Sequence, residues 1–239
     1  MTRAMGAVVG VFAALLLLGG ASAARAVDLA QPMVLVATPD LQGPYMQTAL
    51  LVVPMGDKHI GFILNRATEA SLAKAFPGHA PSAKVIDPIF FGGPEASEAI
   101  FALLRRDPGQ PSIRLFGDLF MTGSGTSIDR IIEQTPNEAR YFAGFVGWMP
   151  EELAAEVEKG YWYIAEPDAA LVFAKNTETM WEDLMRRLGK QPGPRNAGER
   201  DAALGTGSGA RHGACCTSWV ASNFHPTHGG THGTATAPN

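Results

Sequence analysis

Three short motifs built on glycine constrain the fold of this chain more than any other feature. They are Gly61-Phe62-Ile63-Leu64-Asn65-Arg66, Phe90-Phe91-Gly92-Gly93-Pro94 and Gly144-Phe145-Val146-Gly147-Trp148. Glycine reaches backbone angles that other residues avoid, and proline fixes its own φ, so the second motif predicts a strand that ends in a sharp turn. The third motif predicts a bulge or a close backbone approach beside a large buried tryptophan. Two interpretations stay open: core packing with tight turns, or a backbone-lined cleft in which glycines such as Gly92 and Gly93 let a small molecule approach.

The first 26 residues have the three-part plan of a secretory signal peptide. Arg3 gives a positive start, residues 5–18 are apolar and uncharged, and the small-x-small patterns Ala21-Ser22-Ala23 and Ala24-Arg25-Ala26 follow. The apolar run is shorter than the roughly 20 residues of a usual membrane-spanning helix. We therefore expect export to the periplasm, with cleavage after Ala23 or Ala26 and no stable membrane span afterwards. An uncleaved signal that anchors the chain is the alternative.

Composition and charge are those of one globular domain between two flanking segments. The chain has 239 residues, of which 46% are hydrophobic, and a formal net charge of -4. Removal of Arg3 and Arg25 with the signal makes the mature chain more negative by two charges, close to -6. A negative domain is a poor match to a phosphate backbone, which argues against nucleic-acid binding. Because the two cysteines both lie in the C-terminal segment, the domain has neither a thiol nucleophile nor an internal disulfide.

The domain is predicted to span residues 32–189 and to contain several hairpins. Hydrophobic runs predict strands at 33–37, 48–53, 59–64, 89–91, 100–104, 112–116, 119–122 and 140–145. Turn residues Pro54-Met55-Gly56-Asp57 and Gly117-Asp118 join two pairs of them as hairpins. The absence of both a GxGxxG turn and a phosphate-loop lysine motif argues against a doubly wound nucleotide-binding fold. We therefore expect a single α+β domain with a mixed, largely antiparallel sheet flanked by helices.

Four helices are predicted from caps and apolar periodicity. Thr68 is expected to cap a helix over 68–76, and Ser127 to cap one over 128–134. Pro150 marks the start of a third helix, which Gly160 ends. Thr177 is expected to cap the last helix, whose apolar residues recur at helical spacing from 180 to 188. This stripe is interpreted as core, with a partner-binding face as the alternative.

The order and spacing of the motifs resemble the YqgE/AlgH family over nearly all of residues 32–189. Further matching segments are Ala37-Thr38-Pro39-Asp40-Leu41-Gln42, Gly160-Tyr161-Trp162, Pro167-Asp168, Phe173 and 181–189. The resemblance implies a mixed sheet flanked by helices and, because one branch of the family is linked to transcriptional control, a regulatory role. Most family members lack a signal peptide, so a cytosolic role transfers poorly. The chain also departs from the family pattern at Gly43-Pro44, where an acid often precedes the proline, and at Ala67, where proline is usual.

The domain shows no catalytic constellation in its sequence. Its histidines are His59, at the start of a strand, and His79, in a surface loop, and neither lies near a nucleophile signature such as GxSxG. No HExxH motif or paired-cysteine pattern indicates zinc, and no cofactor is expected. Four acids, Glu151, Glu152, Glu156 and Glu158, are interpreted as a solvated helix face. The leading interpretation is a non-enzymatic binding or regulatory module for an unidentified protein or small-molecule partner.

Two segments of the domain are candidate anion sites. Asn65 and Arg66 end a strand, where a guanidinium beside an amide suits a carboxylate or phosphate. An enzyme that acts on an anionic small molecule there is the first alternative function, and a structural salt bridge or loop clamp is the competing role for the pair. Gly123, Ser124 and Gly125 lead into a predicted helix, whose free backbone N–H groups favour anions. The competing role of this loop is a flexible connection with an ordinary serine cap.

The segment 190–239 is predicted to be a disordered tail. It is rich in Gly, Ser, Thr, Pro and Ala, and such a composition buries too little apolar surface to offset the entropy of ordering. Thiolate and imidazole side chains gather in it and are candidate ligands for copper, zinc or nickel, which makes metal handling the second alternative function. These side chains are Cys215, Cys216, His212, His225, His228 and His232. Their spacing matches no zinc module, and an incidental extension is the competing interpretation.

Overall fold

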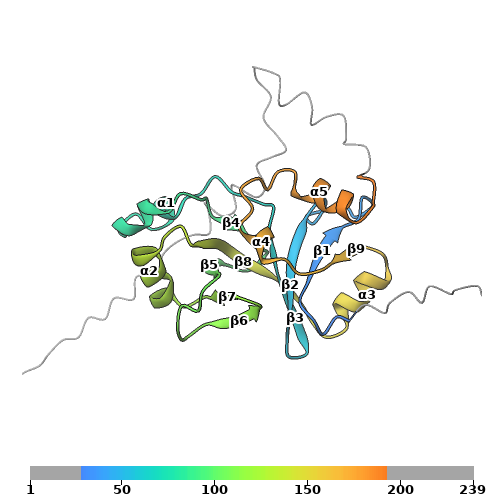
Figure 1. Cartoon of the computed structure of the whole chain (residues 1–239), viewed down its shortest axis with the longest axis horizontal. Coiled ribbons are helices and arrows are strands. Elements are labelled where there is room, and N and C mark those ends of the chain that lie inside the picture. Colours follow the sequence, from blue (N-terminus) through green and yellow to red (C-terminus); the bar gives the residue numbers. More distant parts are fainter. Residues whose placement is uncertain (1–27, 193–239) are drawn as a thin grey trace, which may run out of the picture.

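A nine-stranded sheet forms the centre of the fold (Figure 1). The computed structural model describes residues 28–192, and the predicted signal peptide and nearly all of the predicted tail lie outside them. The strand order is β6-β7-β5-β8-β3-β2-β1-β9, with β4 beside β8. Only the β4–β8 pair is parallel, so the predicted mixed and largely antiparallel sheet is confirmed. The strands are β1 (Met33–Ala37), β2 (Ala49–Met55), β3 (Lys58–Ile63), β4 (Phe90–Phe91), β5 (Glu95–Leu104), β6 (Ile113–Phe116), β7 (Leu119–Thr122), β8 (Ala139–Trp148) and β9 (Trp162–Ala165).

The two hairpins predicted from turn residues are present. Strands β2 and β3 pair through Met55 and Lys58, so Gly56-Asp57 alone forms their turn and the preceding Pro54 and Met55 belong to β2. Strands β6 and β7 pair across Gly117, whose φ is +50°, next to Asp118. In both turns, glycine supplies the left-handed backbone angle that a tight reversal needs.

Strands β5 and β8 are both longer than predicted. The prediction began the first at Ile100 and ended the second at Phe145, whereas β5 begins at Glu95 and β8 continues to Trp148. The register between them shifts between Glu95 and Ile100, so the extra residues are accommodated as an irregularity. The last residues of β8 pair with β3, which joins the two halves of the sheet. Polar side chains in the first half of β5 hid this extension from a hydrophobic pattern.

The helices lie over the sheet faces and edges in two groups (Figure 1). Helix α1 contacts the 3-10 helix η1, which contacts α2, while α3 contacts β9 and α5 contacts β1. Trp181 of α5 donates an indole hydrogen bond to the Ala37 carbonyl oxygen at 2.8 Å, which fixes α5 on the sheet. The helices are α1 (Leu72–Ala75), η1 (Ala80–Lys84), α2 (Gly125–Gln134), α3 (Glu152–Glu158), α4 (Ala169–Val172) and α5 (Met180–Arg187).

Two of the predicted helix starts near threonine are wrong. The first helix is reduced to α1, which Ser71 caps, whereas the Thr68 hydroxyl donates to the Ile89 carbonyl oxygen at 2.7 Å and accepts from the Ala70 N–H at 3.1 Å, before the helix begins. The last helix begins after Thr179, and Thr177 is buried two residues before that cap. Capping preferences depend on which nearby backbone group the hydroxyl reaches, and a sequence does not show that group.

The ends of α3 and α5 agree better with prediction. Helix α3 starts after Glu151, which has a φ of +69°, and Gly160 follows its end as predicted. Gly189, with a φ of +65°, follows α5 as predicted for a residue just past a helix end. The apolar stripe of α5 is core, because Met180, Trp181, Leu184 and Met185 are buried.

The core consists of two clusters on the sheet. The larger one joins β1, β2 and β3 with α5, and it includes a chain of aromatic rings in which Phe62 and Phe142 have centroids 5.4 Å apart. The smaller one lies between β5 and β8 and the group formed by α1, η1 and α2, with Leu104 and Ile131 among its members. The smaller cluster supports the ends of β5 and α2, and these ends carry the candidate site described below.

Candidate functional site

The side chains of Asn65 and Arg66 hydrogen-bond to the backbone of the loop that leads into β2. The Asn65 side chain accepts a hydrogen bond from the Ala49 N–H and donates one to the Gln47 carbonyl oxygen, both at 2.9 Å. Arg66 Nη2 donates to the Met46 carbonyl oxygen at 2.6 Å. Gln47 itself has a left-handed φ of +54°, so the loop takes an unusual path that these bonds hold in place. The geometry favours the structural role over the ligand role for this pair.

The glycines of the second and third motifs lie where two chain segments cross. The Gly92 N–H donates to the Ala143 carbonyl oxygen at 2.8 Å. A Cβ at Gly92 would lie 2.2 Å from the Gly144 carbonyl oxygen, and one at Gly93 would lie 2.2 Å from the Phe145 carbonyl carbon. The space beside Gly92 and Gly93 is therefore filled by the backbone of β8. This close approach favours core packing with tight turns over a backbone-lined ligand cleft as the interpretation of these motifs.

The Gly123-Ser124-Gly125 loop begins α2 earlier than predicted. Helix α2 starts at Gly125 with Ser124 as its N-cap, and the predicted cap, Ser127, is buried inside the first turn. Ser127 Oγ accepts a hydrogen bond from Arg130 Nη2 at 3.3 Å. The strand before this loop, β7, is separated from β3 by β5 and β8, so the two predicted anion sites follow strands that are not neighbours. The sheet does not bring them together.

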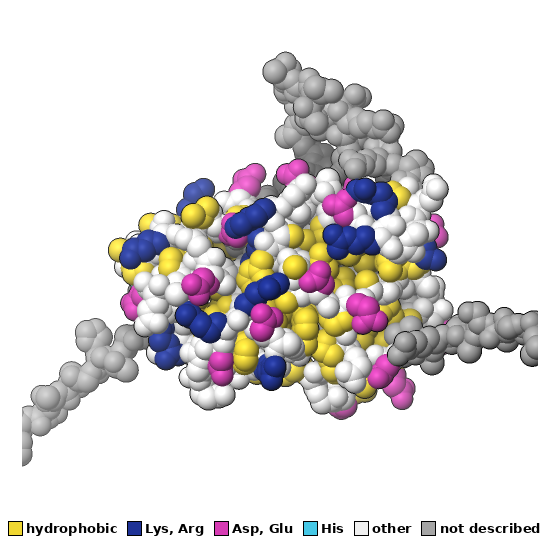
Figure 2. All heavy atoms as spheres, viewed as in Figure 1, with side chains coloured by type: hydrophobic (Ala, Val, Ile, Leu, Met, Phe, Trp, Pro, Cys, Tyr) yellow, Lys and Arg dark blue, Asp and Glu magenta, His cyan; other side chains and the backbone are white. Residues whose placement is uncertain are grey.

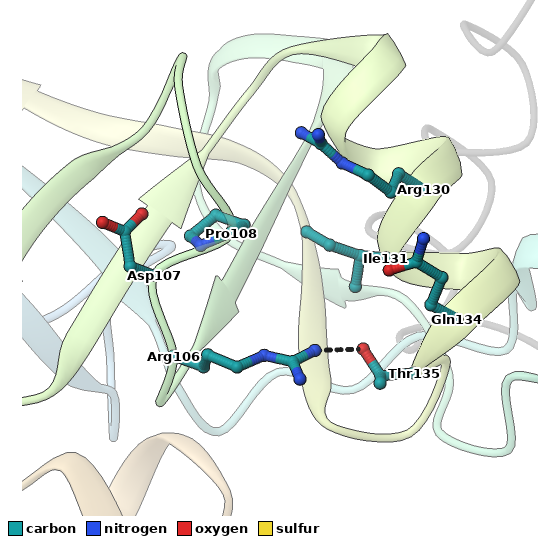
Figure 3. A pocket seen from close by; sticks show the side chains of 7 residues that line it. All are labelled: Arg106, Asp107, Pro108, Arg130, Ile131, Gln134 and Thr135. Atoms are coloured by element: carbon teal, nitrogen blue, oxygen red, sulfur yellow. Dashed lines mark hydrogen bonds between the residues drawn. The ribbon is translucent and has the colours of Figure 1, made fainter.

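A cleft between the end of β5 and α2 joins residues that sequence reasoning did not connect (Figure 3). It has a volume of about 340 Å³. Arg106 extends into it from the residue pair that follows β5, and Arg130 lies across from it on α2. Arg106 Nη2 donates to Thr135 Oγ1 at 3.0 Å. The lining residues are Arg106, Asp107, Pro108, Arg130, Ile131, Gln134 and Thr135.

Amphipathic patterns in two elements place these side chains. In α2, Ile128, Ile131 and Ile132 are buried, which turns Arg130 and Gln134, four residues apart, to the solvent side. Strand β5 ends in buried Leu103 and Leu104, and the next two residues are exposed arginines. An arginine doublet at a strand end and an arginine on the polar side of a helix are visible in the sequence, but only the fold shows that they face one cleft.

The two cleft arginines have limited partners among the acids of the described residues. Arg106 Nη2 lies 3.4 Å from Glu138 Oε2, and the side chains of this pair are 56% and 61% exposed. The carboxylate of Asp107 instead accepts hydrogen bonds from the Gly109 N–H at 2.8 Å and from Ser112 Oγ at 3.1 Å. Asp107 therefore caps its own loop, and the cleft keeps a surplus of positive charge and N–H donors.

A second cleft shares Arg106 with the first. It has a volume of about 330 Å³, and Leu104, Arg105, Arg106, Glu138 and Phe173 line it. Its apolar residues are Leu104 and Phe173, which lie beside three charged side chains. The Arg105 guanidinium lies 5.7 Å from the centre of the Phe173 ring, within the range of a cation–π contact.

A buried arginine lies near these clefts on β8. Arg140, which is 2% exposed, pairs with Asp87 at 3.2 Å, donates to the Ala174 carbonyl oxygen at 2.9 Å and lies over the Phe90 ring at 4.4 Å. Partial burial raises the pKa of Asp87, but the hydrogen bond and charge of Arg140 and the charge of Lys175 outweigh it, so the pKa lies below its usual value. With partners on three segments, Arg140 is a structural group.

Glu156 corrects the prediction of an entirely solvated acidic helix face. Its Oε2 accepts indole hydrogen bonds from Trp148 at 2.9 Å and from Trp162 at 2.8 Å, and both rings are buried. Glu151, Glu152 and Glu158 are exposed as predicted. The carboxylate thus docks α3 onto β8 and β9. Burial and the charge of Glu156, with smaller contributions from Glu95 and Glu152, raise the pKa of the nearby Tyr45.

The histidines of the domain are bound into local structure. His59 Nε2 lies 2.8 Å from the Leu29 carbonyl oxygen. His79 precedes η1, so its loop is more regular than predicted, and its Nδ1 lies 2.8 Å from the fully buried Ser82 Oγ. Within residues 28–192, no group of three or more His, Cys, Asp or Glu side chains has the arrangement of a metal site. The predicted metal ligands of the tail lie outside this range.

No helix among the described residues is both long enough and apolar enough to cross a membrane. The solution structure of AlgH from Pseudomonas aeruginosa superposes with a TM-score of 0.58 at 22% identity, and covers 76% of this chain and 96% of that one. A crystal structure of a Corynebacterium diphtheriae protein gives a TM-score of 0.55 at 26% identity, with 69% of this chain and 88% of that one covered.

Sequence relatives agree with the structural ones. A UPF0301 protein of Chlorobium luteolum is 31% identical over 169 residues, which are 67% of this chain and 87% of the relative. A UPF0301 protein of Cytophaga hutchinsonii is 31% identical over 134 residues, which are 54% of this chain and 72% of the relative. The model of the AlgH-like family matches residues 34–193, which are most of the chain and include nearly all of the residues that the structure describes. This chain therefore belongs to the AlgH-like family, as its glycine motifs predicted.

Proposed function

We propose that this chain is an exported, non-enzymatic binding or regulatory module that holds a small anion between Arg106 and Arg130. The observation that carries the proposal is that two arginines from separate elements line one cleft, together with polar side chains (Figure 3). Arginine presents a planar fork of donors that suits carboxylate and phosphate oxygens. Gln134 and Thr135 add polar groups to the same lining.

The charge balance of the cleft supports an anion. Asp107 is engaged by its own loop, and the exposed Arg106–Glu138 pair belongs to a class of ion pairs that contributes about 1 kcal/mol or less. An incoming anion therefore has little to displace, and it gains contact with a second guanidinium at Arg130. Because both arginines are exposed, we expect this affinity to be modest and to fall as salt is added.

The lining also supports binding without chemistry. Its seven residues include no histidine, cysteine or lysine, and its one carboxylate is already hydrogen-bonded. Over the face in Figure 2, basic and acidic side chains are interspersed, so this face offers no extended basic surface for a nucleic acid. A small anion fits these observations better than a phosphate backbone does.

Calorimetric titration of the purified protein with inorganic phosphate and with acetate at low ionic strength tests the proposal. Arg130→Gln should weaken binding roughly tenfold, the effect expected for loss of one charge-assisted hydrogen bond. Arg187→Gln is the matched control, since Arg187 is an exposed arginine on α5 that does not line the cleft. Equal losses in the two variants, or no binding by the wild type, would refute the anion site.

The proposal of export is based on the signal-peptide pattern of the first 26 residues, and it is tested separately. Mass spectrometry of the cell envelope fraction should find a mature chain that begins at Ala24 or Val27. An intact chain that starts at Met1 in the cytosol would contradict export while leaving the anion site untouched.

A further inference from the structure

The two clefts on either side of Arg106 differ in chemistry, and this difference narrows the class of ligand. The first offers Arg106, Arg130 and polar side chains, whereas the second adds the partly exposed ring of Phe173 beside the charged Arg105 and Glu138. A single arginine lines both, so the two are neighbours. A ligand that fills both therefore needs a charged end and an apolar end.

The carboxylate of Glu138 is the present acidic partner of Arg106, the arginine that lines both clefts. Glu138 Oε2 lies 3.4 Å from Arg106 Nη2, at the wall of the second cleft. Both side chains of this pair are more than half exposed, and such pairs are weak. A carboxylate that reaches both Arg106 and Arg130 makes contacts that Glu138 alone does not, and it can therefore replace Glu138 as the partner of Arg106.

The second cleft favours a compact apolar group rather than a long chain. Its volume is about 330 Å³, near the lower end of the range for small-molecule sites. Phe173 is only partly buried, so one part of its ring packs on the core while another part stays accessible. Aromatic rings pack well against such a surface, and Arg105 above Phe173 adds a flat cationic wall.

We propose that the ligand is a carboxylate that carries a compact apolar group. Its carboxylate lies between Arg106 and Arg130, and its apolar group packs on the accessible part of the Phe173 ring. This inference rests on the proposed anion site and specifies what that site selects. The same chemistry occurs in a free aromatic or branched aliphatic acid and in the last residue of a peptide with a free C-terminus.

Titration with four probes separates the parts of the inference. N-acetylphenylalanine should bind about tenfold more tightly than N-acetylglycine, because burial of part of the ring adds to the contact. The amide of N-acetylphenylalanine should not bind measurably, since it lacks the charge. The fourth probe, 3-phenylpropanoate, distinguishes the sources: equal affinity indicates that a free acid suffices, and weaker binding than N-acetylphenylalanine indicates recognition of a peptide C-terminus.

Variants test the two halves of the site separately. Arg130→Gln should weaken N-acetylphenylalanine and N-acetylglycine alike, whereas Phe173→Ala should remove the preference between them. Glu138→Gln should strengthen both probes severalfold, because it removes the competing carboxylate. If Phe173→Ala fails to fold, chemical-shift changes at the Phe173 ring of the wild-type protein serve instead.

Two results separate this inference from the function on which it depends. Equal affinities of the wild type for N-acetylglycine and N-acetylphenylalanine would overturn the amphipathic ligand and leave the anion site standing. No binding of either acid or of phosphate would overturn both. Unchanged ring shifts of Phe173 during binding of N-acetylphenylalanine would also overturn the inference.

Discussion

Substitution of Gly144 by alanine should be one of the most damaging single changes in this fold. Gly144 lies inside β8 with a left-handed φ of +68°. A Cβ there would lie 2.4 Å from the Gly93 carbonyl oxygen and 2.6 Å from the Glu95 carbonyl oxygen. Both contacts are with backbone atoms, which cannot move aside as the end of a flexible side chain can.

The size of the effect follows from two separate costs. A left-handed backbone costs a residue with a Cβ about 1–2 kcal/mol relative to glycine. Relief of the overlap requires the β8 backbone to move away from both Gly93 and Glu95, so we expect a total cost of at least about 4 kcal/mol. This is a large part of the roughly 5–15 kcal/mol by which a domain is stable.

Two other glycines separate the two costs. Gly117 has a φ of +50° and nothing within 4 Å of an added Cβ, so Gly117→Ala measures the conformational cost alone, about 1 kcal/mol. Gly92 has no left-handed φ, but its Cβ would lie 2.2 Å from the Gly144 carbonyl oxygen, so Gly92→Ala measures the overlap alone. Both Gly92→Ala and Gly144→Ala should therefore destabilise the protein much more than Gly117→Ala.

Urea denaturation followed by circular dichroism measures these differences. With a slope of about 2 kcal/mol per molar urea, Gly144→Ala should lower the midpoint by about 2 M and Gly117→Ala by about 0.5 M. A Gly144→Ala protein that lacks folded signal in the absence of urea agrees with the expectation. If the urea midpoints of Gly144→Ala and Gly117→Ala were equal, the close approach of two backbones would not be the reason that these motif positions require glycine.

Three further predictions concern polar groups that hold the fold. Asp87→Asn should lower the free energy of unfolding by about 3 kcal/mol at neutral pH, because it leaves the buried Arg140 guanidinium without its carboxylate. Lys175→Ala, which removes the exposed partner of Asp87, should lower it by less than about 1 kcal/mol. The pKa of Asp87 is lower in the folded state than its ordinary value of 3.8. The carboxylate therefore stabilises the fold fully above pH 3.8, and this stabilisation is lost as the pH falls through the lower folded-state pKa. The urea midpoints of wild type and Asp87→Asn should converge in that acidic range. Glu156→Ala should cost about 2–4 kcal/mol and change the tryptophan fluorescence, because two indole N–H groups lose their acceptor, while Glu158→Ala on the exposed side of the same helix should change neither. Arg66→Ala should lower stability by about 1–3 kcal/mol without changing phosphate affinity, and native stability in this variant would reopen the enzyme alternative at that corner.

Much of the sheet could be predicted because its signals are local. Strand β1 is an uninterrupted apolar run, and Gly117 and Gly56 mark the two hairpin turns. These features depend on neighbouring residues in the chain, so a sequence carries them directly. The true extent of β5 and β8 depends instead on pairing between residues that are 35 to 50 positions apart in the sequence, and a hydrophobic pattern misses it.

The candidate site could not be predicted for the same reason. Arg106 and Arg130 belong to separate elements, and neither has a neighbour in sequence that marks it as functional. Glu156 looks like any exposed acid on an amphipathic helix, and its role appears only when Trp148 and Trp162 are brought beside it. Long-range contacts decide which polar groups meet, whereas local patterns decide only which faces are polar.

The motifs that identify the family and the residues that form the candidate site are separate sets. Gly92, Gly93 and Gly144 are required by two backbones that approach too closely for a Cβ, whatever the protein binds. Arg106 and Arg130 lie outside every motif that carries the resemblance. Membership of the AlgH-like family therefore accounts for the sheet and says nothing about the ligand. It follows that Gly144→Ala should lower the urea midpoint strongly, whereas Arg130→Gln should leave this midpoint unchanged and weaken anion binding alone. A loss of stability in Arg130→Gln as large as in Gly92→Ala would show that the cleft is part of the scaffold rather than a site built on it.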